Sequence, residues 1–201
     1  MRFTRYNLSG LWYMSVCYIR TKLFYKKSRI IRFPFNIRGG RYIDLGEGLT
    51  TGIGCRLEAI PISNAVEGPI IKLGRNVQIN DYVHFGAIKH IWVGDNVLIA
   101  SKVFISDHNH GVYSGENQSS PLSIPGKREL SYSPVVIEDN VWLGEFVSVL
   151  PGVTIGKGSI VGSNSVVSKS IPEYSIAVGS PAKVIKQYNF DTEKWEKVKK
   201  D

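Results

Sequence analysis

The chain has little of what a metal site, a disulfide framework or a membrane span requires. Its 201 residues include two cysteines, Cys17 and Cys55, which form no C-x-x-C pair and no cluster with histidines. We therefore expect free thiols, a cytoplasmic location and no requirement for a metal. No run of about 18 uninterrupted apolar residues is present, and the N-terminal segment lacks a small-residue cleavage site. These absences argue against a membrane-spanning or exported chain.

Nucleotide-binding motifs are lacking as well. The sequence has no G-x-G-x-x-G on a strand-to-helix turn and no P-loop, so nothing indicates a dinucleotide or nucleoside triphosphate site. Basic residues exceed acidic ones by 25 to 17, for a formal net charge of +8. Such a charge suits a polyanion, an anionic membrane surface or a phosphorylated cofactor without choosing among them. The length is typical of one domain with short appendages.

The dominant feature is an internal repeat with a period of six residues. An apolar residue recurs at each sixth position over three stretches, a small residue usually follows it, and β-branched residues are frequent four places on. A helix or a hairpin meander does not have this period, whereas a triangular coil of three short strands does. The repeat residues are Leu73, Ile79, Phe85, Val93, Ile99, Ile105, Ile137, Leu143, Val149, Ile155, Val161 and Val167.

The repeat predicts an all-β fold, a parallel β-helix in which the repeat residues point inward and stack from coil to coil. Small residues after the repeat positions, such as Gly74 and Gly144, are expected to supply the unusual φ/ψ of tight corners. The alternatives are a right-handed β-helix or a β-sandwich, and the spacing does not fix the hand. Coils are expected to begin near Leu45, Leu73, Val93, Ile137 and Ile155, with outward loops at 59–72, 86–92 and 106–136.

Three segments resemble the hexapeptide-repeat acyltransferases, especially the galactoside, maltose and bacterial polysaccharide O-acetyltransferase branch. IASKVFISDHNHG resembles the segment that leaves the coil with a catalytic histidine, DNVWLGEFVSVLPGVTIGKGSIVGSNSVV the coenzyme-binding coils, and SIAVGSPAKVIK the closing segment. The resemblance covers roughly residues 40–187. It implies a left-handed β-helix, acetyl-CoA as cosubstrate, and a homotrimer with active sites between neighbouring subunits.

The resemblance also implies a general base in the segment that runs from Asp107 to His110. A positioned histidine can take the proton of an acceptor hydroxyl as the oxygen attacks the thioester carbonyl. Family members place this imidazole five positions after the repeat residue, here Ile105. We therefore expect His110 to be the base and keep His108 as the alternative. Asp107 either orients an imidazole or ends the strand. The alternative without catalysis is that the segment is an ordinary polar loop with solvated histidines.

Further site residues follow from the resemblance, position by position. The backbone amide of Glu145 is expected to stabilise the tetrahedral oxyanion, although the family often has a small residue there. Asn80 matches an asparagine that contacts the acceptor, or it is a structural corner residue. Tyr82 replaces a second such asparagine, so the acceptor pocket should differ from that of a galactoside enzyme. The residues implied for acetyl-CoA are Trp142, Gly144, Glu145, Ser163, Ser168, Lys169, Lys183 and Lys186.

The two ends of the chain lie outside the repeat. Segment 1–40 is expected to hold an amphipathic helix, with apolar residues at three- and four-residue steps from Leu8 to Leu23, and a basic connector. This helix should cover the open end of the first coil, or alternatively anchor the chain at the inner face of an anionic membrane. The β-helix should occupy 41–187. Segment 188–201 is expected to form a short helix with Asp191 as its N-cap.

The leading functional prediction is acetyl-CoA-dependent O-acetylation of a saccharide hydroxyl in surface polysaccharide synthesis, of an O-antigen or a capsule. Alternatives are acetylation of a xenobiotic, sugar N-acetylation, serine O-acetylation and a β-helix scaffold without chemistry. No nucleic-acid partner is expected. A zinc-dependent carbonic anhydrase would need three converging histidines among His84, His90, His108 and His110, and the coenzyme motifs argue against it.

Overall fold

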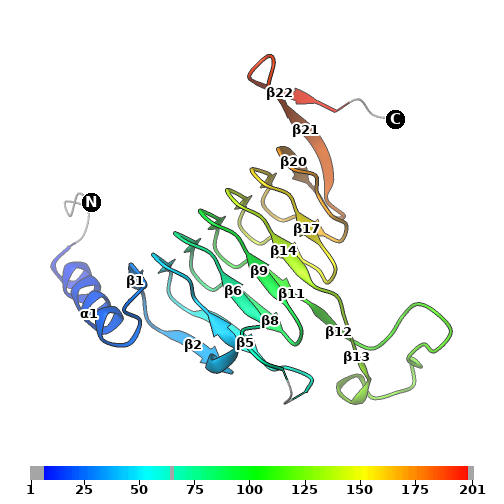
Figure 1. The fold of residues 1–201 in the computed structure, drawn as a ribbon, viewed down its shortest axis with the longest axis horizontal. Coiled ribbons are helices and arrows are strands. Elements are labelled where there is room, and N and C mark those ends of the chain that lie inside the picture. Colours follow the sequence, from blue (N-terminus) through cyan, green and yellow to red (C-terminus); the bar gives the residue numbers. More distant parts are fainter. Residues whose placement is uncertain (1–6, 64–65, 199–201) are drawn as a thin grey trace.

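The computed structural model describes residues 7–63 and 66–198. After one helix, short parallel strands wind around a common axis and form the three faces of a triangular coil (Figure 1). Face A consists of β1 (Ile30–Ile31), β4 (Thr50–Thr51), β7 (Gln78–Ile79), β10 (Leu98–Ile99), β15 (Trp142–Leu143), β18 (Ile160–Val161) and β20 (Ser175–Val178). Face B consists of β2 (Phe35–Arg38), β5 (Cys55–Ala59), β8 (His84–Ala87), β11 (Phe104–Ser106), β16 (Ser148–Val149) and β19 (Val166–Val167). Face C consists of β3 (Ile43–Asp44), β6 (Ile71–Leu73), β9 (Ile91–Val93), β14 (Val135–Ile137) and β17 (Thr154–Ile155).

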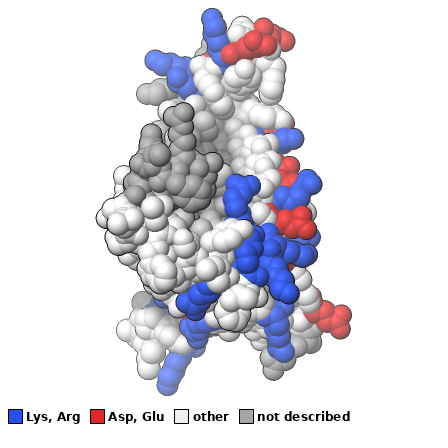
Figure 2. Space-filling model, turned by 90° about the vertical axis from the view of Figure 1, so that its left-hand side faces the viewer, with Lys and Arg blue, Asp and Glu red and all other residues white. Residues whose placement is uncertain are grey.

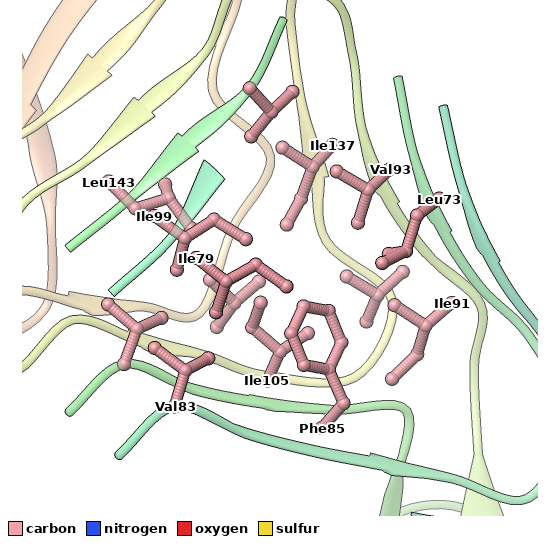
Figure 3. Packing of buried hydrophobic residues seen from close by; sticks show 14 of the residues in the cluster. Leu73, Ile79, Val83, Phe85, Ile91, Val93, Ile99, Ile105, Ile137 and Leu143 are labelled. Atoms are coloured by element: carbon pink, nitrogen blue, oxygen red, sulfur yellow. The ribbon is translucent and has the colours of Figure 1, made fainter. Parts of the chain in front are cut away.

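The repeat residues stack in register along each face, as the period of six predicts. On face A, Ile99 lies between Ile79 of the preceding coil and Leu143 of the next. Figure 3 shows the columns from the three faces meeting in one narrow core, with the Phe85 ring among the aliphatic side chains. Because the core is continuous, each buried repeat residue adds about 1.5–3 kcal/mol of apolar burial to the same cluster.

The corners differ from the prediction. The left-handed backbone occurs three positions after a repeat residue, for example at Asn76 (φ 57°), Tyr82 (φ 59°) and Phe146 (φ 58°). Neither Gly74 nor Gly144 has a positive φ. A Cβ atom on Gly144 would lie 2.6 Å from the backbone nitrogen of Ser163 in the next coil. These glycines are therefore small because successive coils approach closely at the corners, and their expected role in supplying unusual φ/ψ is wrong.

Of the three expected outward loops, segment 86–92 instead stays within the coil, because β8 runs to Ala87, β9 begins at Ile91 and Ile88 between them is buried. The longest loop leaves the coil after β11 and contains the antiparallel strands β12 (His108–His110) and β13 (Leu130–Tyr132), with the 3₁₀ helix η2 (Pro125–Lys127) between them. It protrudes from the corner between faces B and C, which we call edge BC (Figure 1). The chain re-enters face C at Val135, opposite Ile91, so the insertion preserves the phase of the coil.

Both ends of the coil differ from the expected boundaries. The first coil begins at Ile30, inside segment 1–40, and includes the 3₁₀ helix η1 (Gly40–Tyr42). The C-terminal helix is wrong: β21 (Lys183–Asn189) and β22 (Lys194–Lys197) form an antiparallel hairpin instead. The Asn189 side chain accepts hydrogen bonds from the backbone N–H groups of Asp191 and Thr192, so a local turn replaces the expected cap. Residues 199–201 of the expected helix, like residues 1–6, lie outside the described residues.

The helix α1 (Leu8–Phe24) packs on β1 with the side opposite to the expected one. Cys17 and Thr21 are the buried residues of this helix, and the Thr21 hydroxyl accepts a hydrogen bond from the Ile31 N–H (2.8 Å). Leu8 and Trp12 of the apolar stripe are 86% and 74% exposed, so the prediction that this stripe covers the first coil is wrong. Within the described ranges, no helix is long and apolar enough to cross a bilayer.

Candidate active site

A groove of about 860 Å³ lies on face B, next to edge BC. Its floor is formed by outward residues of β5, β8 and β11, and β12 and β13 of the insertion form one wall. Three of the four histidines of the chain, His84, His108 and His110, line it together with Glu58. The groove thus combines titratable side chains with the apolar surface of Phe104 and its neighbours.

Asp107 anchors the base of the insertion. Its side chain is fully buried and accepts hydrogen bonds from the backbone N–H groups of Ile88 (3.0 Å), Lys89 (2.8 Å) and His90 (2.7 Å). Burial raises the pKa of this carboxyl, but the hydrogen bonds from His108 and the three amides outweigh burial and hold the pKa below its usual value. Asp107 therefore remains charged at neutral pH and ties β12 to the loop after β8.

His108 and His110 are two positions apart on β12, so their side chains lie on the same side of the strand. Their rings are edge to face, with centroids 6.2 Å apart. Nδ1 of His108 lies 3.0 Å from Oδ1 of Asp107 and donates to it in the neutral ring, which leaves Nε2 with the lone pair. Among the residues that the structure describes, the ring of His110 has no hydrogen-bond partner and the residue is exposed. Asp107 thus orients His108 and not His110.

The insertion holds the backbone of His110 from the other side. The Tyr113 hydroxyl donates a hydrogen bond to the His110 carbonyl (2.5 Å) and accepts one from Arg128 (2.8 Å). The ring of His110 therefore projects from a fixed backbone while both of its nitrogens stay available to a ligand.

A second charged cluster on the groove floor was not identified from the sequence. Glu58 accepts hydrogen bonds from Arg38 (2.7 Å) and from Nε2 of His84 (3.0 Å), and Arg56 lies 3.1 Å from Nδ1 of His84. Burial lowers the pKa of His84, and Arg56 lowers it further against the opposing effect of Glu58. Burial raises the pKa of Glu58, but Arg38, His84 and Arg56 together bring it below its usual value. At neutral pH the cluster therefore pairs a charged carboxylate with a neutral imidazole.

Gly86 separates this cluster from the insertion histidines. A Cβ atom at Gly86 would lie 3.6 Å from the His108 ring and 3.8 Å from the His84 ring, so the two imidazoles flank one small residue. The only sequence signal for the cluster was the coil phase, which pairs Arg56 with His84 and Glu58 with Gly86 on neighbouring strands.

The expected acceptor residues and the Glu145 amide lie on a different edge. Asn80 and Tyr82 follow β7, and Glu145 follows β15, so all three lie at the corner between faces A and B, which we call edge AB. Among the described residues, the Glu145 N–H donates no hydrogen bond, whereas the matching N–H of Ile53 donates one to the Asp81 carboxylate (2.9 Å). The Glu145 amide is thus available to bind an anion.

The remaining expected coenzyme residues are spread over several faces. Gly144 and Ser163 contact each other at edge AB, and Trp142 projects from face A, where it is 48% exposed. Ser168 and Lys169 follow β19 at edge BC, and Lys183 and Lys186 lie on β21. Edge AB and edge BC are separated by the width of face B, roughly 15 Å for a five-residue extended segment. One chain therefore does not bring the histidines together with the edge AB residues.

Metal chemistry has no organised ligand set in the part of the chain that is described. No group of three or more His, Cys, Asp and Glu residues is placed to hold an ion there. His84 and His108 are instead paired with carboxylates, and His90 packs against Trp92. Cys17 and Cys55 are buried free thiols.

Comparison with known proteins identifies the family. The family model for bacterial transferase hexapeptides (six repeats) matches residues 134–169. The putative lipopolysaccharide biosynthesis O-acetyl transferase WbbJ of Escherichia coli K12 is 48% identical over 194 residues, which cover 96% of each chain. The chain belongs to the hexapeptide-repeat acetyltransferases. The Escherichia coli galactoside O-acetyltransferase is 36% identical over 122 residues, 61% of this acetyltransferase and 56% of the relative.

A solved structure gives the hand of the coil. The N-acyltransferase AntD from Bacillus cereus, in complex with dTDP-4-amino-4,6-dideoxyglucose and coenzyme A, superposes with a TM-score of 0.67 at 21% identity. The match covers 86% of the acetyltransferase and 91% of AntD. The fold is thus the left-handed parallel β-helix, which confirms the architecture predicted from the repeat.

Proposed function

We propose that this acetyltransferase moves an acetyl group from acetyl-CoA to a hydroxyl of a saccharide in the synthesis of a surface polysaccharide, an O-antigen or a capsule. The relative with 48% identity over nearly the whole chain is named for lipopolysaccharide biosynthesis and O-acetyl transfer. Support also comes from the groove, because its mixture of apolar surface and fixed charged groups suits a ligand that has both hydroxyl groups and apolar ring faces.

The observation that carries the proposal is the division of the site between two edges of one chain. The histidine groove lies at edge BC, whereas Asn80, Glu145 and Ser163 lie at edge AB. A ring of subunits places edge BC of one copy beside edge AB of the next, and a cyclic arrangement repeats this contact without leaving an open end. We infer a homotrimer, which the resemblance to the hexapeptide-repeat acyltransferases implies. Each of its active sites lies between two subunits.

His110 is assigned as the general base. It stands five positions after Ile105, at the family's catalytic position, and both nitrogens of its exposed ring are unoccupied. Exposure in one chain is what a residue at a subunit boundary should show. His108 is assigned as a positioning residue, because its Nδ1 is bound to Asp107 and the pair fixes strand β12.

The chemical step follows from these roles. A ring nitrogen of His110 takes the proton from the acceptor hydroxyl as the oxygen bonds to the thioester carbonyl carbon. The N–H of Glu145 from the neighbouring subunit stabilises the resulting oxyanion. When the tetrahedral species collapses, the C–S bond breaks, and the proton passes from His110 to the departing CoA thiolate. The products are an acetyl ester and CoA.

Acetyl-CoA is assigned to the groove between subunits. Trp142 offers an exposed indole to the pantetheine arm, and Gly144 and Ser163 line the corner beside the Glu145 amide. The lysines that would meet the phosphates are Lys169, Lys183 and Lys186. Each of these lysines offers the phosphates only a positive charge. The affinity for acetyl-CoA should therefore depend on the three lysines together more than on any one of them.

The test compares His110→Ala and His108→Ala with His90→Ala, a control on the loop outside the histidine groove. CoA release from acetyl-CoA is measured with sugar, glycan, amino-sugar, antibiotic and serine acceptors. His110→Ala should lower kcat by about 100- to 10,000-fold while acetyl-CoA affinity and the oligomeric state persist. His108→Ala should keep more activity than His110→Ala and should unfold at a lower temperature.

The same experiment can overturn each part of the proposal. Failure of the wild-type protein to bind acetyl-CoA would refute the function. Loss of activity in His108→Ala with activity retained in His110→Ala would reverse the assigned roles. Full turnover by a monomer, shown by light scattering at the assay concentration, would refute a site shared between subunits.

A further inference from the structure

Helix α1 turns its apolar stripe away from the protein. With 3.6 residues per turn, five large apolar residues fall within a stripe about 80° wide, and the packed residues Cys17 and Thr21 lie on the opposite side. These five side chains are between 43% and 86% exposed. We call them the outer face of α1: Leu8, Trp12, Val16, Ile19 and Leu23.

Exposure on this scale indicates a missing partner. A helix in a water-soluble domain normally packs its apolar stripe against the core, and exposed apolar patches of contiguous large side chains mark interaction sites. Here the contact with the coil is made by other residues of the helix: Cys17 and Thr21 are buried, and the Ile31 N–H donates a hydrogen bond to the Thr21 hydroxyl. The outer face is therefore free to bury its apolar area elsewhere without loosening the helix from β1.

The positive charge of the chain is concentrated in the N-terminal part of the sequence that contains this helix. Residues 1–43 contain ten Lys and Arg and no Asp or Glu. The remaining residues contain 15 basic and 17 acidic side chains, so the whole positive excess of the chain belongs to its first 43 residues. Arg20 and Lys22 flank the outer face on the helix, and the exposed Lys26 and Lys27 follow its end.

Figure 2 views the molecule from the side on which α1 lies. Basic side chains gather along one side of an uncharged surface, and acidic side chains stand next to some of them near the same edge. A surface with apolar side chains at its centre, basic side chains around them and no acidic residue in the same segment matches the chemistry of an anionic lipid bilayer.

We propose that the outer face of α1 docks the acetyltransferase on an anionic lipid bilayer. The five apolar side chains enter the boundary between headgroups and acyl chains, and the surrounding lysines and arginines contact the anionic headgroups. A second copy of this chain is a poorer occupant, because two such surfaces would bring like charges together without any acidic residue of the segment to offset them. This inference goes beyond the proposed function and does not depend on the acceptor.

Vesicle co-sedimentation tests the proposal with the full-length protein. Vesicles of phosphatidylcholine alone are compared with vesicles that also contain phosphatidylglycerol, at low and at raised salt. The wild-type protein should bind the anionic vesicles, should bind the neutral ones much more weakly, and should be released by salt. Lys26→Glu combined with Lys27→Glu should lower the partition coefficient by roughly 5-fold or more for each lysine. Trp12→Gln combined with Ile19→Gln should lower it by about 100-fold.

Matched controls are available at the far side of the molecule. Lys194→Glu combined with Lys197→Glu makes the same change in net charge on β22, at the opposite end of the coil from α1 (Figure 1). Leu122→Gln removes an apolar side chain that is 94% exposed in the insertion. Both controls should bind anionic vesicles as the wild-type protein does. Thermal melting and acetyl-CoA binding of every variant show that the fold and the proposed active site persist.

Two outcomes would overturn the proposal. The first is a wild-type protein that binds acetyl-CoA but does not sediment with anionic vesicles, or sediments equally after the Trp12 and Ile19 substitutions. The second is a change in oligomeric state caused by these two substitutions without any vesicle binding by the wild-type protein. That second result would make the outer face a contact between copies of the chain.

Discussion

Asp107→Ala is expected to destabilise the folded acetyltransferase by about 4 kcal/mol, more than any ordinary surface substitution. The carboxylate is fully buried and is the acceptor for three consecutive backbone N–H groups, from Ile88 to His90, and for the His108 ring. Among the described residues, no other side chain accepts a hydrogen bond from these three amides. Its removal would leave them unpaired in a place where the chain turns from face B to face C.

The magnitude follows from the hydrogen bonds. An unsatisfied buried amide costs about 1–3 kcal/mol, and a hydrogen bond to a charged group contributes about 1.5–3 kcal/mol net. The full sum would overestimate the loss, because water can reach part of the loop once the carboxylate is gone. Removing one member of a buried charged network typically costs about 3–5 kcal/mol. In a chain of this size, about 4 kcal/mol corresponds to a fall in Tm of roughly 8–16 °C.

The assay is urea and thermal unfolding followed by circular dichroism, with Asp139→Ala as the matched control. Asp139 is also a corner aspartate, but it is only half-buried and accepts one backbone hydrogen bond, from the Asp95 N–H (2.7 Å). Its loss should cost about 1 kcal/mol. If Asp107→Ala and Asp139→Ala shift the midpoint equally, the account of Asp107 as the anchor of the insertion is wrong.

Two further predictions concern pH and packing. Because hydrogen bonds depress the pKa of folded Asp107 below 3.8, its charged form stabilises the fold above that pH, and this contribution is lost as the pH falls through the lower folded value. Urea midpoints should therefore drop below about pH 4 in the wild type and more shallowly in Asp107→Asn. Gly144→Ala should cost about 1–3 kcal/mol, because its Cβ would lie 2.6 Å from the Ser163 nitrogen. Gly126→Ala, with open space around the position, should leave Tm unchanged. Equal melting of the two alanine variants would contradict the close approach of the coils.

The coil was predictable because its determinants repeat locally. Each inward position recurs after six residues, so Ile79, Ile99 and Leu143 identify one another as neighbours without any knowledge of the fold. The insertion was predictable for the same reason, since the period stops at Ile105 and resumes in phase at Ile137.

Features that depend on packing across the coil were not predictable in this way. The apolar spacing of α1 indicated a stripe, but spacing does not say which side of a helix meets the protein, and Cys17 and Thr21 took that place. The C-terminal hairpin depends on the pairing of Tyr188 with Trp195, whose rings lie 5.3 Å apart. A pairing of this kind is not encoded in local helix propensity.

The candidate site was predictable in part. The sequence identified the histidine segment as functional but did not separate the roles of His108 and His110. Asp107 pairs with His108 because backbone amides of the preceding coil hold the Asp107 carboxylate in place. The cluster of Glu58, His84 and Arg56 joins residues up to 28 positions apart. Only the lateral register of β5 and β8 brings them together, and charged residues at outward positions carry no periodic signal.

The insertion begins and ends on the same edge of the coil. Ser106 still pairs with Gly86 where the chain departs, and Val135 pairs with Ile91 where it returns. The length and sequence of the intervening segment are therefore uncoupled from the winding of the core. Changes in the length or sequence of this segment can therefore alter the wall of the groove, and with it the choice of acceptor. They do so without changing the coil that carries the segment.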